Sequence, residues 1–179
     1  MHQNIFIIGP LGAGKSSVGF HIAKRLRMRF YDSDREVENR SGVDIDWMFA
    51  IEGEAGFRSR EQQVIEELSQ QPNTVIATGG GTVVIPECRA ALSSRGICVY
   101  LQVPYSEQLS RVKRFPAKRP MLENNPEVRL QQLNDQRQAL YEEIADLSYT
   151  NNTSNAQKLA IDIIKDIKKI EQNNPKDSK

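Results

Sequence analysis

Short runs of consecutive apolar residues alternate along the chain with segments whose apolar residues recur every three or four positions. The runs cover residues 4–8, 30–32, 74–78, 97–103 and 147–150. Their length suits β-strands, and apolar side chains on consecutive residues are typical of strands covered on both sheet faces. The pattern therefore predicts an α/β fold with a five-stranded, parallel, doubly wound sheet.

The intervening segments carry the periodicity of helices. Val18, Ile22 and Leu26 follow the first run at intervals of four, and Pro86 suits the first turn of a later helix. Further helices are expected from about residues 35, 106 and 126. A last helix has its apolar stripe at Leu159, Ile163, Ile167 and Ile170. The polar residues 172–179 are expected to be a disordered tail.

Two segments do not fit this simple alternation. Residues 35–73 are far more than one crossover helix requires, which predicts a helical substrate-binding insertion at about 33–61. The segment KRFPAKRPMLENNP at 113–126 is rich in Pro and basic residues, which is typical of a mobile lid, here about 113–125. Residues 1–171 are otherwise expected to form one domain.

Composition narrows the class of protein. The chain has 179 residues, enough for one domain, and 24 Lys and Arg against 23 Asp and Glu leave a net charge of +1. Neither nucleic acid nor an acidic membrane is therefore expected as a partner. Cys88 and Cys98 form no CxxC motif, and His2 and His21 have no zinc-ligand spacing. With no targeting segment and no apolar run of membrane-spanning length, a cytoplasmic protein is expected.

Residues 9–16, GPLGAGKS, match the pattern G-x-x-x-x-G-K-[ST] between a predicted strand and a predicted helix. In such a phosphate loop the backbone N–H groups surround the phosphates, the lysine bridges the β- and γ-phosphates, and the serine binds Mg²⁺. A glycine-rich turn without ligand is the alternative. The expected ATP contacts are Gly12, Ala13, Gly14, Lys15, Ser16 and Ser17.

Further features indicate the nucleotide and the metal. The chain lacks the N/T-K-x-D stretch of guanine-specific proteins, so ATP is expected. The third strand ends in Thr78 and glycines rather than in an acid, which leaves Asp32 to support Mg²⁺ with Ser16. In FYDSD, Asp32 and Asp34 point to one side if the segment is extended. The alternative is that Ser33 or Asp34 caps a helix starting at Arg35.

These motifs together resemble the shikimate kinases over about residues 4–170. The resemblance rests on order and spacing of GPLGAGKS, FYDSD, GFRSRE at 56–61, TGGGTV at 78–83, KRP at 118–120 and RQALYEEIA at 137–145. It implies the P-loop NTP hydrolase fold of the nucleoside monophosphate kinases. It also implies a monomer that uses Mg²⁺ and transfers the γ-phosphoryl group of ATP to the 3-hydroxyl of shikimate, toward chorismate and the aromatic amino acids.

The resemblance also implies roles for substrate-binding residues. Asp34 would hold the reacting hydroxyl, while Arg58, which Glu61 could orient one helical turn on, and Arg137 would bind the carboxylate. For Arg137, which lies within an apolar helical stripe, an internal salt bridge or a snorkelling side chain is the alternative. The glycine run at residues 79–81 would let substrate oxygens approach backbone N–H groups, or simply form a tight turn. Its members are Gly79, Gly80 and Gly81.

Other implied contacts have equally plain alternatives. Phe49 and Phe57 would line the substrate ring, or be core residues. Arg119 would neutralise charge on the transferring phosphoryl group, and Arg111 would stack on adenine. Ser154 lies where an adenine loop is expected, but with Gln157 it also forms a capping box.

Two competing functions remain at this stage. A kinase for another hydroxylated acid such as gluconate should lack the grouping of Asp34, Arg58 and Arg137, which this chain has. A nucleotide-gated binding domain without chemistry would usually have lost Asp34, Arg119 or the glycine run, and all are present.

Overall fold

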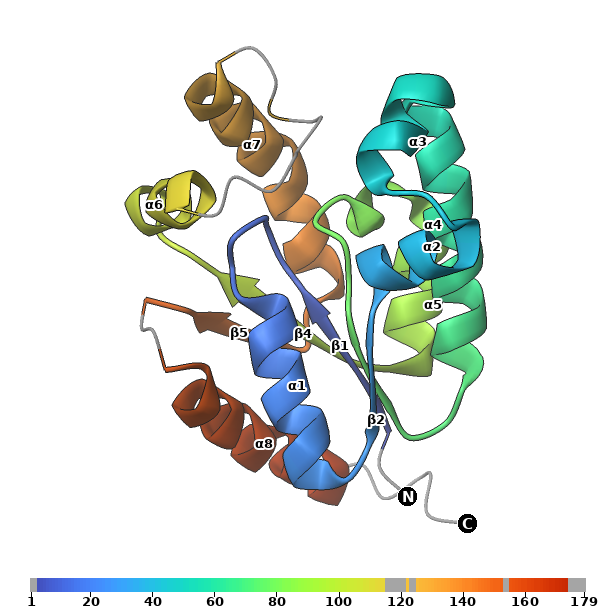
Figure 1. The fold of residues 1–179 in the computed structure, drawn as a ribbon. Helices are drawn as coiled ribbons and strands as arrows, with labels where there is room; N and C mark the ends of the chain where they lie inside the picture. Colours follow the sequence, from blue (N-terminus) through green and yellow to red (C-terminus); the bar gives the residue numbers. More distant parts are fainter. Residues whose placement is uncertain (1–2, 115–121, 123–124, 153–154, 174–179) are drawn as a thin grey trace.

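Five parallel strands form one sheet in the order β2-β3-β1-β4-β5 (Figure 1). The computed structural model describes residues 3–114, 122, 125–152 and 155–173. The strands are β1 (Asn4–Ile8), β2 (Arg29–Asp32), β3 (Thr74–Ala77), β4 (Gly96–Gln102) and β5 (Leu147–Thr150). The expected five-stranded parallel sheet is confirmed, and the strand bounds differ from the expected ones by at most one residue.

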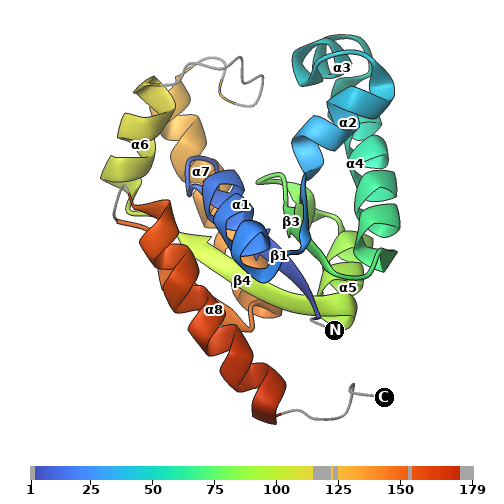
Figure 2. The ribbon, with the colours of Figure 1, turned by 60° about the horizontal axis from the view of Figure 1, so that its bottom comes forward.

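Helices cover both faces of this sheet (Figure 2). Along β1, Ile5 and Ile7 pack in one core with helices α1 (Lys15–Leu26) and α8 (Ala156–Asn173). Phe6 and Ile8 point to the other face and pack in a second core. Most other side chains of that second core come from α4 (Gly53–Gln70), α5 (Pro86–Arg95) and α7 (Pro126–Ile144), and Val37 and Met48 add to it from the segment between β2 and α4. Consecutive side chains of β1 point to opposite faces of the sheet, and both faces are covered. This explains why apolar residues follow one another without interruption.

Helical segments rise on two sides of the carboxyl end of β1, where the phosphate loop begins (Figure 1). On one side lie α2 (Ser33–Ser41), α3 (Ile45–Ile51) and the first half of α4. On the other lie α6 (Tyr105–Arg114) and the start of α7. A short 3₁₀ turn, η1 (Thr82–Val84), follows β3 and contacts α4, α5 and α7. In parallel α/β sheets ligands bind at the carboxyl ends of the strands, so these segments flank the expected site.

The junction of β2 and α2 differs from the expectation. The strand ends at Asp32, and α2 begins at Ser33 rather than near Arg35. Asp32 is the N-cap, with its Oδ1 accepting from the Arg35 N–H at 3.3 Å. Ser33 is buried, and its hydroxyl accepts from the Gly79 N–H at 2.8 Å. The expected cap by Ser33 or Asp34 is therefore wrong, and Asp34 belongs to a helix rather than to an extended pair.

The last helix is longer than expected. Helix α8 continues through Asn173, so Gln172 and Asn173 are helical rather than part of a disordered tail, and residues 174–179 lie outside the described chain.

Both cysteines are free and buried, and burial raises the pKa of Cys88 and of Cys98 to about 12. None of the helices in the described ranges has the length and apolarity needed to span a bilayer.

Candidate active site

The phosphate loop joins β1 to α1. Gly12 and Gly14 have φ values of 76° and 87°, a left-handed conformation that residues with a Cβ rarely adopt. Gly14 is also the N-cap of α1, so the N–H groups of Lys15, Ser16 and Ser17 lie in the first turn, at the positive end of the helix. The Lys15 Nζ donates to the carbonyls of Gly9 and Pro10, each at 2.8 Å. The six residues expected to contact ATP thus lie in one continuous segment, the loop and the first turn of α1.

Arg111 of α6 lies against this loop. Its guanidinium donates to the Gly12 carbonyl at 3.1 Å and to the Asn151 carbonyl at 3.3 Å, and it pairs with Glu107 at 3.0 Å. The buried Asn151 follows β5 and donates from Nδ2 to the Ala13 carbonyl at 2.8 Å. These contacts hold Arg111 between the phosphate loop and the residue that follows β5. The expected contacts at Arg119 and Ser154 lie outside the described residues.

Ser16 and Asp32 supply two adjoining oxygen atoms. The Ser16 hydroxyl donates to Asp32 Oδ2 at 2.5 Å, which joins the phosphate loop to the end of β2. Mg²⁺ prefers oxygen ligands, keeps several of its waters and binds through one or two protein groups plus substrate phosphates. The described residues contain no group of three or more His, Cys, Asp or Glu suited to a metal, so a larger cage is not found there. This pair fits the magnesium site expected from the sequence.

Asp34, in the first turn of α2, carries the most perturbed carboxylate near the loop. Its pKa is raised from the ordinary 3.8 to about 7, first by burial and then by the charges of Glu61 and Asp32, against opposing effects of Lys15 and Arg58. No donor among the described residues forms a hydrogen bond with this carboxylate. Asp34 is therefore free to accept a hydrogen bond, or a proton, from a bound hydroxyl.

Arg58 of α4 is held rigidly by carboxylates. Its guanidinium pairs with Glu61 at 2.5 Å and with Glu54 at 3.2 Å. Glu61 is 0% exposed, and its other oxygen accepts from the Thr82 hydroxyl at 2.5 Å. Burial lowers the pKa of Arg58, but the two glutamates more than offset this, so that the pKa lies above its usual range. The expected orientation of Arg58 by Glu61 is confirmed.

Arg137 of α7 has a different environment. Its guanidinium lies close enough to the buried Tyr141 hydroxyl for the two groups to influence one another's pKa. Burial, with a further contribution from the positive charge of Arg58, lowers the pKa of Arg137 below its usual range. In the described ranges no carboxylate forms an ion pair with it, so the internal salt bridge considered above is not found. The positive charges of Arg58 and Arg137 therefore repel one another, and an anion bound by both guanidinium groups would offset this repulsion.

Aromatic side chains line the same region. The rings of Phe49 and Phe57 lie 5.0 Å apart between centroids, and the Arg58 guanidinium lies 5.2 Å from the Phe57 centroid. Phe57 is 4% exposed and belongs to the core, while Phe49 is partly buried beside it. Phe57 thus acts as a core residue that supports Arg58. Arg60, whose side chain is 41% exposed, forms a surface ion pair with Glu52 at 2.7 Å.

The glycine run leaves room for protein side chains. A Cβ on Gly79 would lie 2.5 Å from both the Asp34 and the Glu61 carboxylate oxygens, and one on Gly81 would collide with the Arg58 guanidinium. Gly80 differs, because the nearest atom to a Cβ there would be the Leu11 nitrogen at 3.4 Å, an ordinary contact. The missing side chains of Gly79 and Gly81 therefore let Asp34, Glu61 and Arg58 come together.

This contrast gives a matched pair of substitutions. Gly79→Ala should lower kcat by about tenfold or more, because displacing either buried carboxylate by an ångström costs that much alignment. Gly80→Ala should keep kcat within about threefold of wild type, since the new methyl group fits with ordinary contacts. Steady-state kinetics of both purified variants tests this. Equal losses in the two would show that the run has another task.

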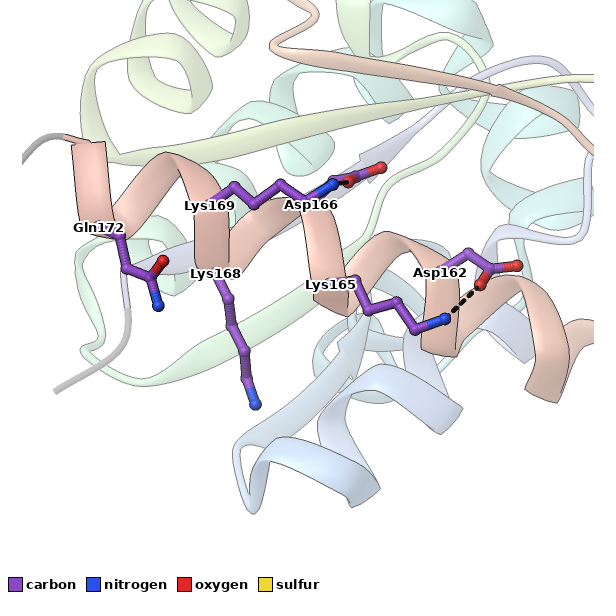
Figure 3. A pocket seen from close by; sticks show the side chains of 6 residues that line it. All are labelled: Asp162, Lys165, Asp166, Lys168, Lys169 and Gln172. Atoms are coloured by element: carbon purple, nitrogen blue, oxygen red, sulfur yellow. Dashed lines mark hydrogen bonds and ion pairs between the residues drawn. The ribbon is translucent and has the colours of Figure 1, made fainter.

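A separate hollow of about 470 Å³ lies along α8 (Figure 3). It is lined by Asp162, Lys165, Asp166, Lys168, Lys169 and Gln172. Lys165 pairs with Asp162 at 3.2 Å and Lys169 with Asp166 at 2.6 Å, both within the helix. Charges that compensate one another along one exposed helix are typical of a solvated surface, so this hollow resembles no ligand site.

Comparison with known proteins agrees with the geometry at the ends of β1, β2 and β3. Residues 11–168 match the family described as shikimate kinase, which is most of the chain. The chain belongs to the shikimate kinase family. A shikimate kinase of Legionella pneumophila (strain Corby) is 50% identical over 164 residues, or 91% of this chain and 93% of that protein. One from Buchnera aphidicola is 48% identical over 170 residues, or 94% and 98%.

Solved structures give the same family. The structure described as shikimate kinase from Acinetobacter baumannii in complex with shikimate has a TM-score of 0.92 and 42% identity, and covers 96% of each chain. A gluconokinase from Sinorhizobium meliloti has a TM-score of 0.65, covering 99% of this chain and 98% of that one, but only 15% identity. It therefore shows the P-loop kinase fold alone. The expected family and fold are confirmed.

Several residues that organise this shikimate kinase site escaped the sequence analysis. They are Glu54, Thr82, Gln108, Asn134 and Asn151, together with the hydroxyl of Tyr141. The amides lie on otherwise ordinary amphipathic helices or at a strand end, and their partners are distant in sequence. A polar residue at a buried position of a helical stripe, as Gln108 is, was the one available signal.

Proposed function

We propose that this protein transfers the γ-phosphoryl group of ATP to the 3-hydroxyl of shikimate, giving shikimate 3-phosphate and ADP. One observation carries the proposal. Asp34 lacks a hydrogen-bond donor and Arg137 lacks a carboxylate among the described residues, and both lie in the cluster around Arg58 and Glu61. Shikimate offers what they lack, hydroxyl groups and a carboxylate on one small ring.

Each residue has a task that follows from its environment. Arg58, fixed by Glu54 and Glu61, and Arg137 hold the carboxylate of shikimate as planar forks. That leaves the ring hydroxyls toward Asp34, which aligns the attacking oxygen and accepts its proton. Because phosphoryl transfer has a loose transition state, alignment by Asp34 contributes more than basicity.

The nucleotide is held from the other side. The phosphate loop and the first turn of α1 present backbone N–H groups to the phosphates, and Lys15 moves from the loop carbonyls to the β- and γ-phosphates. Arg111 lies on the side where the base enters, and we include Arg119 as the lid residue that neutralises the transferring group. Ser16, and Asp32 through a hydrogen-bonded water, would hold Mg²⁺, whose positive charge would stabilise the negative charge of the phosphates.

The raised pKa of Asp34 predicts a pH dependence. As the pH falls through about 7, Asp34 gains a proton and can no longer accept the proton of the hydroxyl. We expect kcat/KM for shikimate to fall by up to about tenfold per pH unit on that acid side. Initial rates of ADP formation between pH 5 and 9 measure it. A profile that stays flat down to pH 5, the region of an ordinary carboxylate, would contradict the assignment.

The function itself is tested by a coupled ADP-release assay with ATP and Mg²⁺. Shikimate, quinate, gluconate and AMP are compared as acceptors, and shikimate should stimulate ADP release by far the most. Stimulation by gluconate alone would favour the sugar-acid kinase considered from the sequence, and no stimulation by any acceptor would favour a binding domain. We further propose a cytoplasmic monomer without nucleic-acid or membrane partners, in one domain with a mobile lid, for which sedimentation tests the monomer.

A further inference from the structure

The carbonyl groups of the phosphate loop are all occupied. Every carbonyl from Gly9 to Gly14 accepts a hydrogen bond from the protein. The donors are Lys15 for Gly9 and Pro10, Gln108 for Leu11, Arg111 for Gly12, Asn151 for Ala13 and the Val18 N–H for Gly14. The bonds to Leu11, Gly12, Ala13 and Gly14 do not involve Lys15, so they keep these peptide planes, and with them the directions of the N–H groups, fixed when Lys15 turns to the phosphates.

Among the side chains that donate to these carbonyls, Gln108 is the most deeply buried. It is 0% exposed, and its Nε2 donates to the Leu11 carbonyl at 2.8 Å. The same Nε2 donates to Asn134 Oδ1 at 3.3 Å, while Asn134 Nδ2 donates back to Gln108 Oε1 at 2.7 Å. Both hydrogens and the oxygen of the Gln108 amide are therefore used. A buried polar group this well satisfied has one geometry rather than several.

Asn134 connects this amide to α7. Three and seven residues further along the same helix lie Arg137 and Tyr141, and the Tyr141 hydroxyl donates to the Gly80 carbonyl at 2.5 Å. The Tyr141 ring is stacked on that of Tyr100, with 5.0 Å between centroids. Helix α7 is thus tied to the phosphate loop through Gln108 and to the glycine run through Tyr141. It also carries the guanidinium of Arg137.

We propose that Gln108 and Asn134 are positioning residues that hold the phosphate loop in register with α7. The proposal rests on the function proposed above, in which the loop holds ATP and Arg137 holds the carboxylate of the acceptor. Neither amide touches a substrate in this scheme. Their hydrogen bonds set how the γ-phosphoryl group lies relative to an acceptor bound on α7, so their loss affects alignment more than acceptor affinity.

The test is a double-mutant cycle with Gln108→Met and Asn134→Leu. Each single variant should lower kcat by about tenfold and weaken binding of MgADP by about fivefold, with KM for shikimate within about twofold of wild type. The double variant should be no slower than the slower single, because two residues that act as one unit are not additive. Steady-state kinetics and calorimetric titration with MgADP give these values.

Gln138→Met is the matched control. Gln138 lies on α7 one turn beyond Asn134, is exposed, and donates to Glu142 at 2.9 Å. Its replacement should leave kcat, KM and MgADP affinity within about twofold of wild type. Thermal unfolding of all variants shows whether each is folded under assay conditions, and the half-buried Asn134 site should accept leucine with a shift of a few degrees.

Three results would overturn the proposal. They are unchanged kcat in folded variants, multiplicative losses in the double variant, and a rise in KM for shikimate without a fall in kcat. Loss of folding in both single variants would also overturn it, since the amides would then be structural only. If the wild-type enzyme shows no shikimate-dependent turnover, the proposed function fails, while the MgADP titration still decides whether the amide pair orients the loop.

Discussion

Asp34→Asn should lower kcat by about 10³-fold while leaving the affinity for MgATP within about threefold of wild type. The amide has nearly the shape of the carboxylate, but it cannot take a proton and one of its two polar atoms no longer accepts hydrogen bonds. Loss of a general base together with alignment of the hydroxyl is worth that much in comparable enzymes. Single-turnover kinetics and a separate MgATP titration distinguish the two effects. Equal losses of turnover and MgATP affinity would show that Asp34 serves the nucleotide instead.

The same substitution should stabilise the protein. The pKa of Asp34 is about 7 in the folded protein against an ordinary 3.8, so between about pH 4 and 7 the folded state holds a proton that the unfolded chain has released. Stability therefore falls as the pH rises through that window, and the full penalty is present above pH 7. A shift of about three units corresponds to about 4 kcal/mol as an upper bound. This bound already includes the attraction of Lys15 and Arg58, and because interactions in proteins are screened we expect about half of it, a gain of about 2 kcal/mol at pH 8.

Denaturant unfolding at pH 8 and pH 4 measures this gain, which should nearly vanish at the lower pH. Asp44→Asn is the control, since Asp44 caps α3 through a 2.7 Å hydrogen bond from the Trp47 N–H, and asparagine caps equally well. That variant should keep both turnover and stability. An Asp34→Asn protein that is inactive and also less stable at pH 8 would contradict the electrostatic explanation, because the carboxylate would then be a structural partner.

The strands and the phosphate loop could be predicted because their causes are local. Strands covered on both faces must be apolar on consecutive residues, as 5–8 and 97–101 are, and the loop needs glycine where φ is positive, as at Gly12 and Gly14. FYDSD could not be resolved in this way. Whether Asp32 continues a strand or caps a helix depends on its contacts with Arg35 and Ser16, and the second of these lies in another element.

The contacts around Glu61 were beyond the sequence for a related reason. Spacing within one helix predicts that Glu61 can reach Arg58, and it does. It says nothing of the Thr82 hydroxyl, which comes from η1, or of the space that Gly79 leaves for two carboxylates. Predictions from periodicity end where contacts between elements begin, and a site at the meeting point of several strand ends consists mostly of such contacts.

Arg137→Met should raise KM for shikimate by about 100-fold with little change in stability. A charged group that leaves its bound partner unpaired typically costs 2–5 kcal/mol, and 2.7 kcal/mol corresponds to about 100-fold. The folded protein loses little, because burial and Arg58 already disfavour the positive charge of Arg137 and no carboxylate in the described chain is left without its cation. Kinetics with varied shikimate, together with thermal unfolding, measures both quantities. An unchanged KM would contradict the assignment of Arg137 to the carboxylate.

Arg58→Met should weaken shikimate binding to a similar degree but also destabilise the fold. It leaves the fully buried Glu61 without its cation, and breaking a buried ion pair from one side costs about 3–5 kcal/mol. Arg60→Met, which removes a half-exposed pair with Glu52, should cost less than about 1 kcal/mol and leave KM unchanged. If Arg58→Met and Arg137→Met raised KM equally but both kept full stability, Glu61 would not depend on Arg58. Arg58 is thus expected to contribute both to the stability of the fold and to shikimate binding, whereas Arg137 contributes to shikimate binding alone.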